Sequence, residues 1–174
     1  MEKFRKLALS ENILKAIEEA HFTEPSEIQE KTIPLILEGK DVLGSSATGS
    51  GKTLAFGAGI IERIKKGKGI QALILTPTRE LTQQVTKTLG KFSKHFHLNV
   101  CEVYGGVGIM PQIRNLSYAE IVVGTPGRIK DHLERRTLNL SKLKFLVLDE
   151  ADRMLDMGFI HDVESIINAC PKER

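Results

Sequence analysis

Residues 44–53 have the sequence Gly-Ser-Ser-Ala-Thr-Gly-Ser-Gly-Lys-Thr, GSSATGSGKT, which ends like a phosphate-binding loop. The first glycine of the common pattern GxxxxGK[ST] falls on Ser46. Gly49 and Gly51 still supply the backbone freedom that lets successive N–H groups converge on phosphates. We therefore expect a working phosphate loop in which Ser46 needs only to avoid a positive φ.

The segments on either side of this loop predict a strand before it and a helix after it. Val42-Leu43 is an apolar pair that we expect to be the first central strand, and helical spacing begins at Leu54. A helix N-terminus adds partial positive charge next to a bound anion. In that setting Lys52 can reach the β and γ phosphates of a nucleotide, and the Thr53 hydroxyl can ligate Mg²⁺. A flexible Gly/Ser-rich loop explains neither the Lys-Thr ending nor these flanks.

Short apolar segments recur along the chain between longer stretches with helical periodicity, at residues 42–43, 72–75, 100–103, 121–123 and 145–148. This alternation is typical of βα units, in which helices cover both faces of a parallel sheet. Helix-start signals at Ser10, Ser26 and Thr125 support it. We predict an α/β fold with a mostly parallel central sheet. The length of 174 residues, without repeats or a long linker, predicts a single domain over residues 1–174.

Acidic residues follow the last apolar segment directly, at Asp149, Glu150 and Asp152. At the end of a strand, Asp149 can hold Mg²⁺ through water, and Glu150 can orient or deprotonate the water that attacks the γ phosphate. An acidic helix N-terminus explains Asp152 nearly as well, because carboxylates there favour the helix dipole. For the first two acids, a position at a buried strand end favours catalysis.

The composition narrows the classes of partner. A net charge of +3 allows a polyanionic partner but does not require one. The low aromatic content of 5%, without tryptophan, argues against a surface that stacks many bases. Cys101 and Cys170 lack CxxC spacing and are expected to be small buried residues, and the histidines show no metal-ligand spacing. The chain has no signal-peptide pattern and no apolar run long enough for a bilayer, so we expect a cytoplasmic protein without a membrane partner.

With GSSATGSGKT and VLDEAD both placed, the chain resembles the N-terminal RecA-like domain of DEAD-box ATP-dependent RNA helicases. The resemblance covers essentially all 174 residues, and residues 1–40 include a region like the Q motif. It also rests on Phe4, FTEPSEIQ at 22–29, PTREL at 77–81, Gly105-Gly106 with Gln112 and Leu116, TPGR at 125–128 and RMLDMGF at 153–159. The resemblance implies a three-layer RecA-like P-loop domain.

The resemblance implies ATP and Mg²⁺ as cofactors. Gln29 would pair with the adenine edge, and Phe22 or Phe4 would pack beside the ring. The other nucleotide contacts would come from Thr48, Gly49, Ser50, Gly51, Lys52 and Thr53. Catalytic roles would fall to Lys52, Asp149, Glu150 and Asp152, with Thr53 and Asp149 at the metal and Asp152 coupling the nucleotide site to a second domain.

The resemblance also implies RNA as a partner. An RNA path that holds sugar and phosphate, with little sequence preference, would be lined by Pro77, Thr78, Arg79, Gly106, Thr125, Gly127 and Arg128.

The residue patterns also fit structural roles. Ser26-x-x-Gln29 matches a capping box, in which the Gln29 side chain bonds the Ser26 backbone instead of adenine. The spacing alone does not distinguish these two roles of Gln29. The resemblance favours the adenine contact. Thr125-Pro126 is fully explained by helix initiation, although the start of a helix can also bind a phosphate. Arg79 lies at the expected start of a helix, where a positive charge interacts unfavourably with the helix dipole. Helix initiation therefore does not explain an arginine at this position, and a functional role explains it better.

The chain departs from the family pattern in two ways. Ser46-Ala47 replaces Ala-Gln, Ser26 replaces Thr, Thr82 replaces Ala and His21 replaces Gly, all at small or exposed sites that should leave the site workable. The chain also stops at Arg174, before the Ser-Ala-Thr motif of the next strand. We therefore expect the second RecA-like domain, with its residues that resemble arginine fingers, to lie outside this sequence.

These observations lead to one main hypothesis and two alternatives. The main hypothesis is the nucleotide-binding domain of a monomeric RNA helicase that couples ATP hydrolysis to RNA binding and local duplex unwinding, with weak or absent hydrolysis by this chain alone. The first alternative is a nucleotide- or RNA-binding module without turnover of its own. The second, a small-molecule kinase, lacks support because no lid-like arginine cluster follows the loop.

Overall fold

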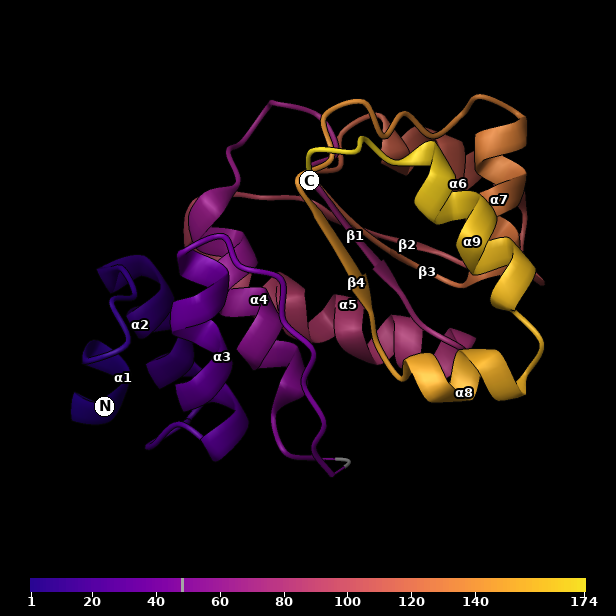
Figure 1. Cartoon of the computed structure of the whole chain (residues 1–174). Helices are drawn as coiled ribbons and strands as arrows, with labels where there is room; N and C mark the ends of the chain where they lie inside the picture. The colour runs from indigo at the N-terminus through magenta and orange to yellow at the C-terminus, as the bar shows by residue number, and fades with distance from the viewer. Residues whose placement is uncertain (48) are drawn as a thin grey trace. The chain divides into compact units, whose positions relative to one another are not determined.

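The computed structural model describes residues 1–47 and 49–174, drawn in Figure 1. They form two compact units, the first of residues 1–64 and 88–97 and the second of residues 65–87 and 98–174. Thr48, a predicted nucleotide contact, lies outside the described residues. The single domain predicted for residues 1–174 stays a prediction.

The first unit is helical, with α1 (Glu2–Arg5), α2 (Glu11–Glu19), α3 (Glu27–Leu37), α4 (Lys52–Arg63) and a 3₁₀ turn η1 (Lys94–Phe96). Ile13 and Ile17 of α2 lie one helical turn apart and are fully buried, as expected for an amphipathic helix. Helices α3 and α4 approach closely at Gly59, where an added Cβ would lie 2.5 Å from Ile36 Cγ2. This close packing places the end of the phosphate loop next to the start of α3.

The second unit is built on a parallel sheet. Among the described residues its strands are β1 (Ala72–Leu75), β2 (Val100–Val103), β3 (Ile121–Gly124) and β4 (Phe145–Leu148), in the order β2-β3-β1-β4. In register, Ala72 lies beside both Ile121 and Phe145. The predicted α/β class with a parallel sheet is confirmed.

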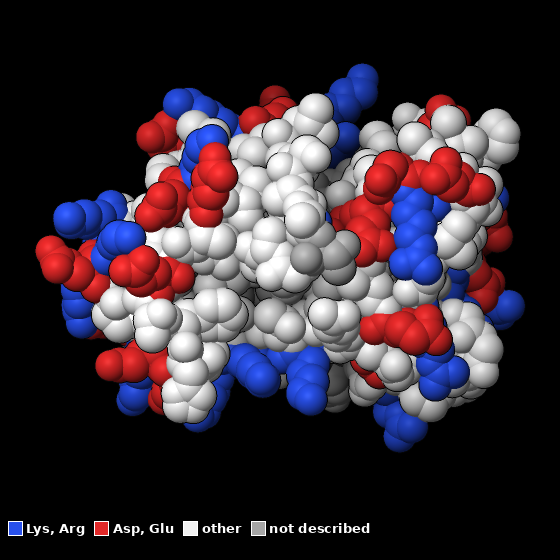
Figure 2. Space-filling view, turned by 90° about the horizontal axis from the view of Figure 1, so that it is seen from below, with Lys and Arg blue, Asp and Glu red and all other residues white. Residues whose placement is uncertain are grey.

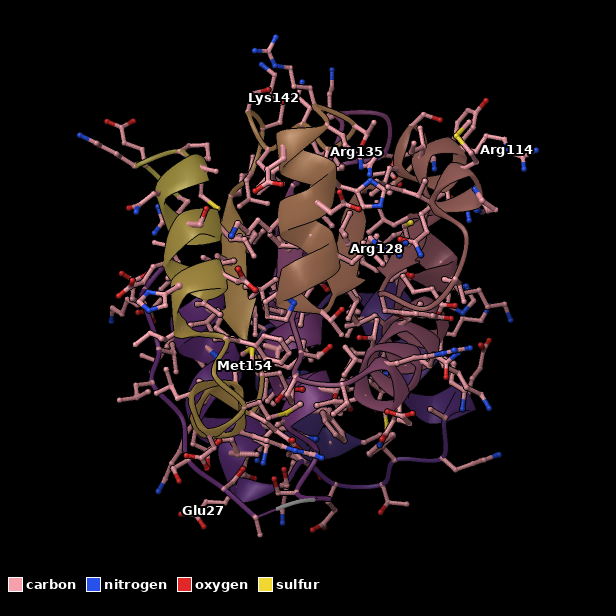
Figure 3. The ribbon with its side chains drawn as sticks, turned by 90° about the vertical axis from the view of Figure 1, so that its right-hand side faces the viewer. Glu27, Arg114, Arg128, Arg135, Lys142 and Met154 are labelled. Carbon is pink, nitrogen blue, oxygen red and sulfur yellow. The ribbon has the colours of Figure 1, made fainter. Side chains whose placement is uncertain are left out.

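One face of this sheet is covered by α6 (Ile109–Leu116), α7 (Pro126–Glu134) and α9 (Ile160–Ala169), as Figure 1 shows. The short helix α8 (Ala151–Asp156) follows β4. Ile129, Met154 and Ile166 from three of these helices belong to one buried cluster with Leu73 and Leu75 of β1. Met154 is labelled in Figure 3 near the base of this layer. The long helix α5 (Arg79–Ser93) contributes residues to both units.

The strand predicted at Val42-Leu43 is absent. Residues 41–47 have no regular secondary structure, and Leu43 is 102% exposed. A strand is stabilised by hydrogen bonds to a neighbour, and strands usually run to about 5–6 residues, so two apolar residues alone do not determine one. The helix predicted after the loop is present and begins at Lys52, two residues earlier than the apolar pattern indicated.

Gly124, the last residue of β3, occupies a position where no side chain fits. A Cβ there would lie 2.6 Å from the Val103 carbonyl oxygen and 2.7 Å from Ile129 Cδ1. Because Val103 O is backbone of the paired strand, β2 and β3 would have to separate. We expect Gly124→Ala to lower the free energy of unfolding by about 2–3 kcal/mol, and the midpoint of thermal unfolding by roughly 5–10 °C.

The matched control is Gly90→Ala on α5, where no atom lies within 4 Å of the added Cβ. This exchange should leave stability unchanged or raise it slightly, because alanine favours helix. Thermal and urea unfolding of the two variants measure the difference. Equal midpoints for both would show that the contact at Gly124 does not restrict the side chain.

Candidate functional site

The candidate residues of the second unit share one edge of the sheet. Because all strands are parallel, their carboxyl ends meet at that edge, and each is followed there by a candidate segment, namely residues 76–79, 104–106, 125–128 and 149–150. Ligands of open α/β sheets bind outside this edge. The topology therefore brings together motifs that are far apart in the sequence.

Backbone hydrogen bonds fix the positions of these segments relative to one another. The Thr76 N–H donates to Gly124 O at 2.9 Å, the Thr125 N–H donates to Val103 O at 3.0 Å, and the Asp149 N–H donates to Leu75 O at 2.9 Å. The sheet ladder thus continues one residue past β1, β3 and β4. Rigid placement of this kind is what a binding site requires of its first residues.

Glycine geometry in the phosphate loop agrees with the prediction. Gly49 has φ 82° and Gly51, the N-cap of α4, has φ 86°, both in the left-handed region that glycine adopts readily. Ser46 lies outside that region, as expected, and its hydroxyl is 2.7 Å from the Ser50 hydroxyl. The serine that replaces the first glycine of the pattern therefore helps to close the loop.

Lys52 folds back onto the same loop. Its ammonium donates to the carbonyl oxygens of Ser46 at 2.7 Å and Ala47 at 3.2 Å. Thr53 follows as the second residue of α4. A bound phosphate would compete with these carbonyls for the ammonium, and its negative charge makes it the stronger acceptor.

Gln29 joins the start of α3 to the phosphate loop. Its side chain is 1% exposed, accepts a hydrogen bond from the Ser26 N–H at 3.0 Å and donates one to Gly51 O at 3.1 Å. The Ser26 hydroxyl donates to Ser50 O at 2.7 Å. The capping box is therefore present. An amide has two donor hydrogens and two acceptor lone pairs, so the adenine contact is compatible with these bonds and stays a prediction.

The two aromatic candidates for the adenine ring differ in exposure. Phe4 is fully buried in the first unit, whereas Phe22 is 37% exposed. The Phe22 ring lies 6.0 Å from the Phe92 ring, centroid to centroid, in a tilted pair. Of the two, Phe22 therefore has ring surface available to a ligand.

The acidic segment after β4 combines burial with an unusual backbone. Asp149 is 8% exposed, and Glu150 has φ 54° as the N-cap of α8. A left-handed conformation is uncommon for a residue with a side chain, and such outliers cluster at functional sites. The Glu150 carboxylate accepts a hydrogen bond from Arg153 Nη1 at 3.3 Å. Asp152 is exposed in the first turn of α8, where the helix dipole also favours it.

Arg79 is held over an aromatic ring. Its guanidinium carbon lies 4.8 Å from the centroid of Tyr104, which is 7% exposed. The Tyr104 hydroxyl donates a hydrogen bond to Glu102 at 3.0 Å and accepts one from the Gln83 amide at 3.0 Å. These two bonds hold the ring in position. The cation–π contact offsets the unfavourable dipole that Arg79 meets at the start of α5. Sequence reasoning missed Tyr104.

Behind Tyr104 lies a buried polar network that sequence reasoning also missed. The Gln112 amide donates to Tyr104 O at 2.9 Å and lies 3.1 Å from His132 Nε2, while His132 Nδ1 is 2.8 Å from the Thr137 hydroxyl. Burial, reinforced by the nearby Arg128 cation, lowers the pKa of His132. With its proton on Nε2, the ring would donate to Gln112 Oε1 and accept through Nδ1 from the Thr137 hydroxyl, which also lies 3.2 Å from His132 O. No local pattern marks such a long-range set.

The remaining RNA-path candidates differ in exposure. Arg79, Gly106 and Gly127 are exposed, Thr78, Thr125 and Arg128 are half-buried, and Pro77 is buried. Arg128 Nη1 donates to Val107 O at 3.1 Å, and Figure 3 shows Arg128 on the α6 side of α7. Thr78 accepts the Leu81 N–H at 3.2 Å as a cap of α5. Pro77 is therefore out of reach of a ligand, whereas Arg79, Gly106 and Gly127 are exposed to solvent, and their contact with RNA stays a prediction.

Thr82, one of the departures from the family pattern, is fully buried below this segment. Its hydroxyl is 2.6 Å from the Thr76 hydroxyl and donates to Thr78 O at 2.9 Å. The extra hydroxyl therefore ties together the residues on either side of Pro77.

The surface charges are mixed. On the face drawn in Figure 2, acidic and basic side chains alternate and do not gather into one large basic field. The cysteines take no part in the candidate site: Cys101 and Cys170 are free and buried, and burial raises the pKa of Cys101 to about 12. Within residues 1–47 and 49–174, no helix has the length and apolar character to cross a bilayer.

Residues 26–174 match the model of the DEAD/DEAH box helicase family. The chain belongs to this family. It is 53% identical to the ATP-dependent RNA helicase CshA of Listeria monocytogenes, over 100% of this chain and 34% of that protein. It is 50% identical to a probable ATP-dependent RNA helicase of Methanocaldococcus jannaschii, over 98% of this chain and 47% of that protein. The chain of this DEAD/DEAH box protein thus spans about a third to a half of the length of these relatives.

A solved structure agrees with the family. The crystal structure of a DEAD box protein from the hyperthermophile Methanococcus jannaschii has a TM-score of 0.96 and 50% sequence identity, covering 99% of this chain and 48% of that chain. A second, of a hypothetical ATP-dependent RNA helicase from Sulfolobus tokodaii, has a TM-score of 0.87 and 42% identity. The DEAD/DEAH box chain therefore has the RecA-like fold of these neighbours.

Proposed function

We propose that this chain is the ATP-binding and RNA-binding part of an ATP-dependent RNA helicase. The observation that carries the proposal is the meeting of family segments 76–79, 104–106, 125–128 and 149–150 at the carboxyl edge of one sheet. In the whole protein, ATP hydrolysis would be coupled to RNA binding and to local opening of duplexes. The protein acts as a cytoplasmic monomer in this proposal.

Nucleotide binding falls to the phosphate loop and to Gln29. The N–H groups after Gly49 and at the start of α4, together with Lys52, bind the phosphates, and Gln29 with Phe22 binds adenine. The hydroxyl of Thr53 and the carboxylate of Asp149 are hard oxygen ligands of the type that Mg²⁺ takes, so these residues fit that metal. When bound, Mg²⁺ neutralises phosphate charge.

Hydrolysis falls to the acids after β4. Glu150 orients the water that attacks the γ phosphate, forming the new P–O bond as the bond to the β-phosphate oxygen breaks. The water's proton passes to Glu150 or to solvent, and the products are ADP and inorganic phosphate. Asp152 couples the nucleotide to a second domain in this proposal.

The RNA part of the proposal predicts that Arg79→Ala weakens binding of single-stranded RNA by about tenfold, because a charge-assisted hydrogen bond to phosphate contributes about 1.5–3 kcal/mol. Fluorescence anisotropy with a labelled RNA of 20 nucleotides measures the affinity. Tyr104→Leu removes the ring below the guanidinium and should weaken binding about threefold, whereas Tyr104→Phe keeps the ring and should bind nearly as well as wild type.

Thermal unfolding of each variant separates a loss of binding from a loss of fold. RNA affinity of a folded Arg79→Ala variant that equals wild type would remove Arg79 from the RNA path. Equal affinities of the Tyr104→Leu and Tyr104→Phe variants would show that the ring does not position Arg79.

The alternative function is a binding module without turnover, and the length of the chain favours it. The chain spans 34% of the Listeria relative, so the larger part of that protein's length has no counterpart here. The two functions differ only in hydrolysis, so phosphate release from Mg-ATP distinguishes them.

A further inference from the structure

The opposite edge of the sheet, where the strands begin, has its own set of polar residues. Gln71, Asn99, Glu120 and Lys144 each precede a strand directly. The Gln71 N–H donates to Glu120 O at 2.9 Å, and the Lys144 N–H donates to Gln71 O at 2.8 Å. Strands of four residues separate this edge from the candidate RNA path by about 13 Å at 3.3 Å per residue. The ATP and RNA roles proposed above use none of these residues.

Two buried polar side chains hold the loop of residues 65–70 above this edge. Gln71, 1% exposed, accepts from the Lys65 N–H at 3.0 Å and donates to Lys65 O at 2.7 Å. Glu120, 2% exposed, accepts from the Gly67 N–H at 2.9 Å and from the Asn99 N–H at 2.7 Å. A loop that is simply solvated does not need buried side chains as hydrogen-bond partners. Burying a carboxylate costs free energy of folding unless hydrogen bonds or an ion pair satisfy its oxygens. The loop is therefore held in one shape.

The side chains presented by this edge are mostly cationic, with exposed lysines at Lys65, Lys66, Lys68, Lys142 and Lys144. The two lysine-bearing segments lie close to each other at Gly69, where an added Cβ would be 3.9 Å from Lys142 Cγ. Within the described stretches 65–72, 98–99, 117–121 and 142–145, Glu120 is the one acid, and Lys66 bonds it at 3.2 Å. Figure 3 shows Lys142 at this end of the unit. Arg135, labelled nearby, is already paired with Asp131 at 2.7 Å.

A hollow of about 210 Å³ lies among Lys66, Asn99, Tyr118 and Glu120. Tyr118 is 72% exposed, and its carbonyl oxygen accepts from the Asn99 side chain at 2.8 Å, which fixes its backbone. Tyr118 lines this hollow together with Lys66, and the other lysines lie on the same edge. An exposed aromatic ring with cations on the same surface is the combination that binds single-stranded nucleic acid, with phosphates on the cations and a base on the ring. An acidic peptide would use the lysines but has no need of the ring.

We propose that this lysine edge, defined as Lys65, Lys66, Lys68, Lys142, Lys144 and Tyr118, is a second contact surface for single-stranded RNA, separate from the path at the carboxyl edge. The choice of RNA as the polyanion rests on the proposed function. Lysine ammonium groups are point charges that hold phosphate without reading bases, so the surface binds RNA of any sequence.

The test compares Lys65→Gln/Lys68→Gln with Lys6→Gln/Lys15→Gln, which removes the same charge from exposed positions in the first unit. Lys66 is left unchanged because of its bond to Glu120. Affinity for a labelled single-stranded RNA of 20 nucleotides is measured by anisotropy at several salt concentrations without nucleotide. We expect the first variant to bind about 3–10-fold more weakly than the control, with a salt slope smaller by about 1.4 for two lost phosphate contacts.

Tyr118 provides a second arm. Tyr118→Ala should weaken RNA binding about fivefold or more, and Tyr118→Phe should bind as wild type, because stacking requires only the ring. If Arg79→Ala weakens binding while Lys65→Gln/Lys68→Gln binds as Lys6→Gln/Lys15→Gln does and Tyr118→Ala binds as wild type does, the lysine edge is not an RNA surface and the proposed function stands. If the wild-type chain binds no RNA, the RNA part of the proposed function fails with it. The proposal would be overturned if poly-glutamate displaced the labelled RNA at the same concentrations as unlabelled RNA and Tyr118→Ala bound RNA as wild type does. That result would assign the edge to acidic proteins.

Discussion

Lys52→Ala will weaken the binding of ATP to this chain by about 100-fold. Two charge-assisted hydrogen bonds to the β and γ phosphates contribute about 3 kcal/mol together, and each 1.4 kcal/mol is a factor of ten in affinity. The ammonium already lies inside the loop, bonded to Ser46 O at 2.7 Å. It therefore needs only to exchange a carbonyl for a phosphate when the nucleotide binds.

Titration with a fluorescent ATP analogue, or calorimetry, measures this change. The control is Lys31→Ala, which removes the same charge from an exposed site on α3, where Lys31 pairs with Glu27. That variant should bind ATP as wild type does, since an exposed pair of this kind contributes little to stability. Unchanged ATP affinity in Lys52→Ala would overturn the assignment of residues 44–53 as a phosphate loop.

The second large effect concerns turnover: we expect this chain to release phosphate from Mg-ATP no faster than its Glu150→Gln variant, with or without single-stranded RNA. Phosphoryl transfer is catalysed chiefly by charges placed around the γ phosphate, and an arginine supplied by another domain is worth about 10³-fold or more. We propose that such a cation comes from outside these 174 residues. A longer chain that includes the region found in the relatives should hydrolyse ATP about 10³-fold faster.

Two controls make this result interpretable. The Glu150→Gln variant must bind ATP as tightly as wild type, because its role is in the chemical step. Asp156→Asn, an exposed acid at the end of α8, should leave every rate unchanged. Phosphate release by the chain alone that rises with RNA and disappears in Glu150→Gln would show that these residues complete the chemistry themselves. The binding-module alternative would then be excluded.

Several features of the fold were predictable because they depend on neighbours in the sequence. Residues 72–75, 100–103 and 145–148 were predicted as strands and are strands, and Ser10, Ser26 and Thr125 are N-caps as predicted. The prediction of a strand at Val42-Leu43 was wrong. A strand forms by pairing with a neighbouring strand, and the apolar character of two residues does not show whether such a neighbour is present. The strand order β2-β3-β1-β4 could not be predicted either, since it depends on which segments pack together.

Gln29 shows where local pattern reasoning reaches its limit. The Ser26-x-x-Gln29 spacing allowed a capping box or an adenine contact, and the structure adds a third role, a bond to Gly51 O. That bond crosses from α3 to the phosphate loop, over 22 residues. No spacing rule covers such a pair, because it exists only when α3 and α4 pack side by side.

What the sequence determined by itself is the chemistry of each motif: glycines with positive φ at 49 and 51, Lys52 and Thr53 at the start of a helix, and acids at the end of a strand. These properties follow from the residue and its immediate neighbours. Only the tertiary structure decided which groups meet: Arg79 over Tyr104, His132 between Gln112 and Thr137, and Glu120 below a lysine-bearing loop. Such pairs join residues that are close only after the parallel strands align, so their energies depend on the whole fold and not on local spacing.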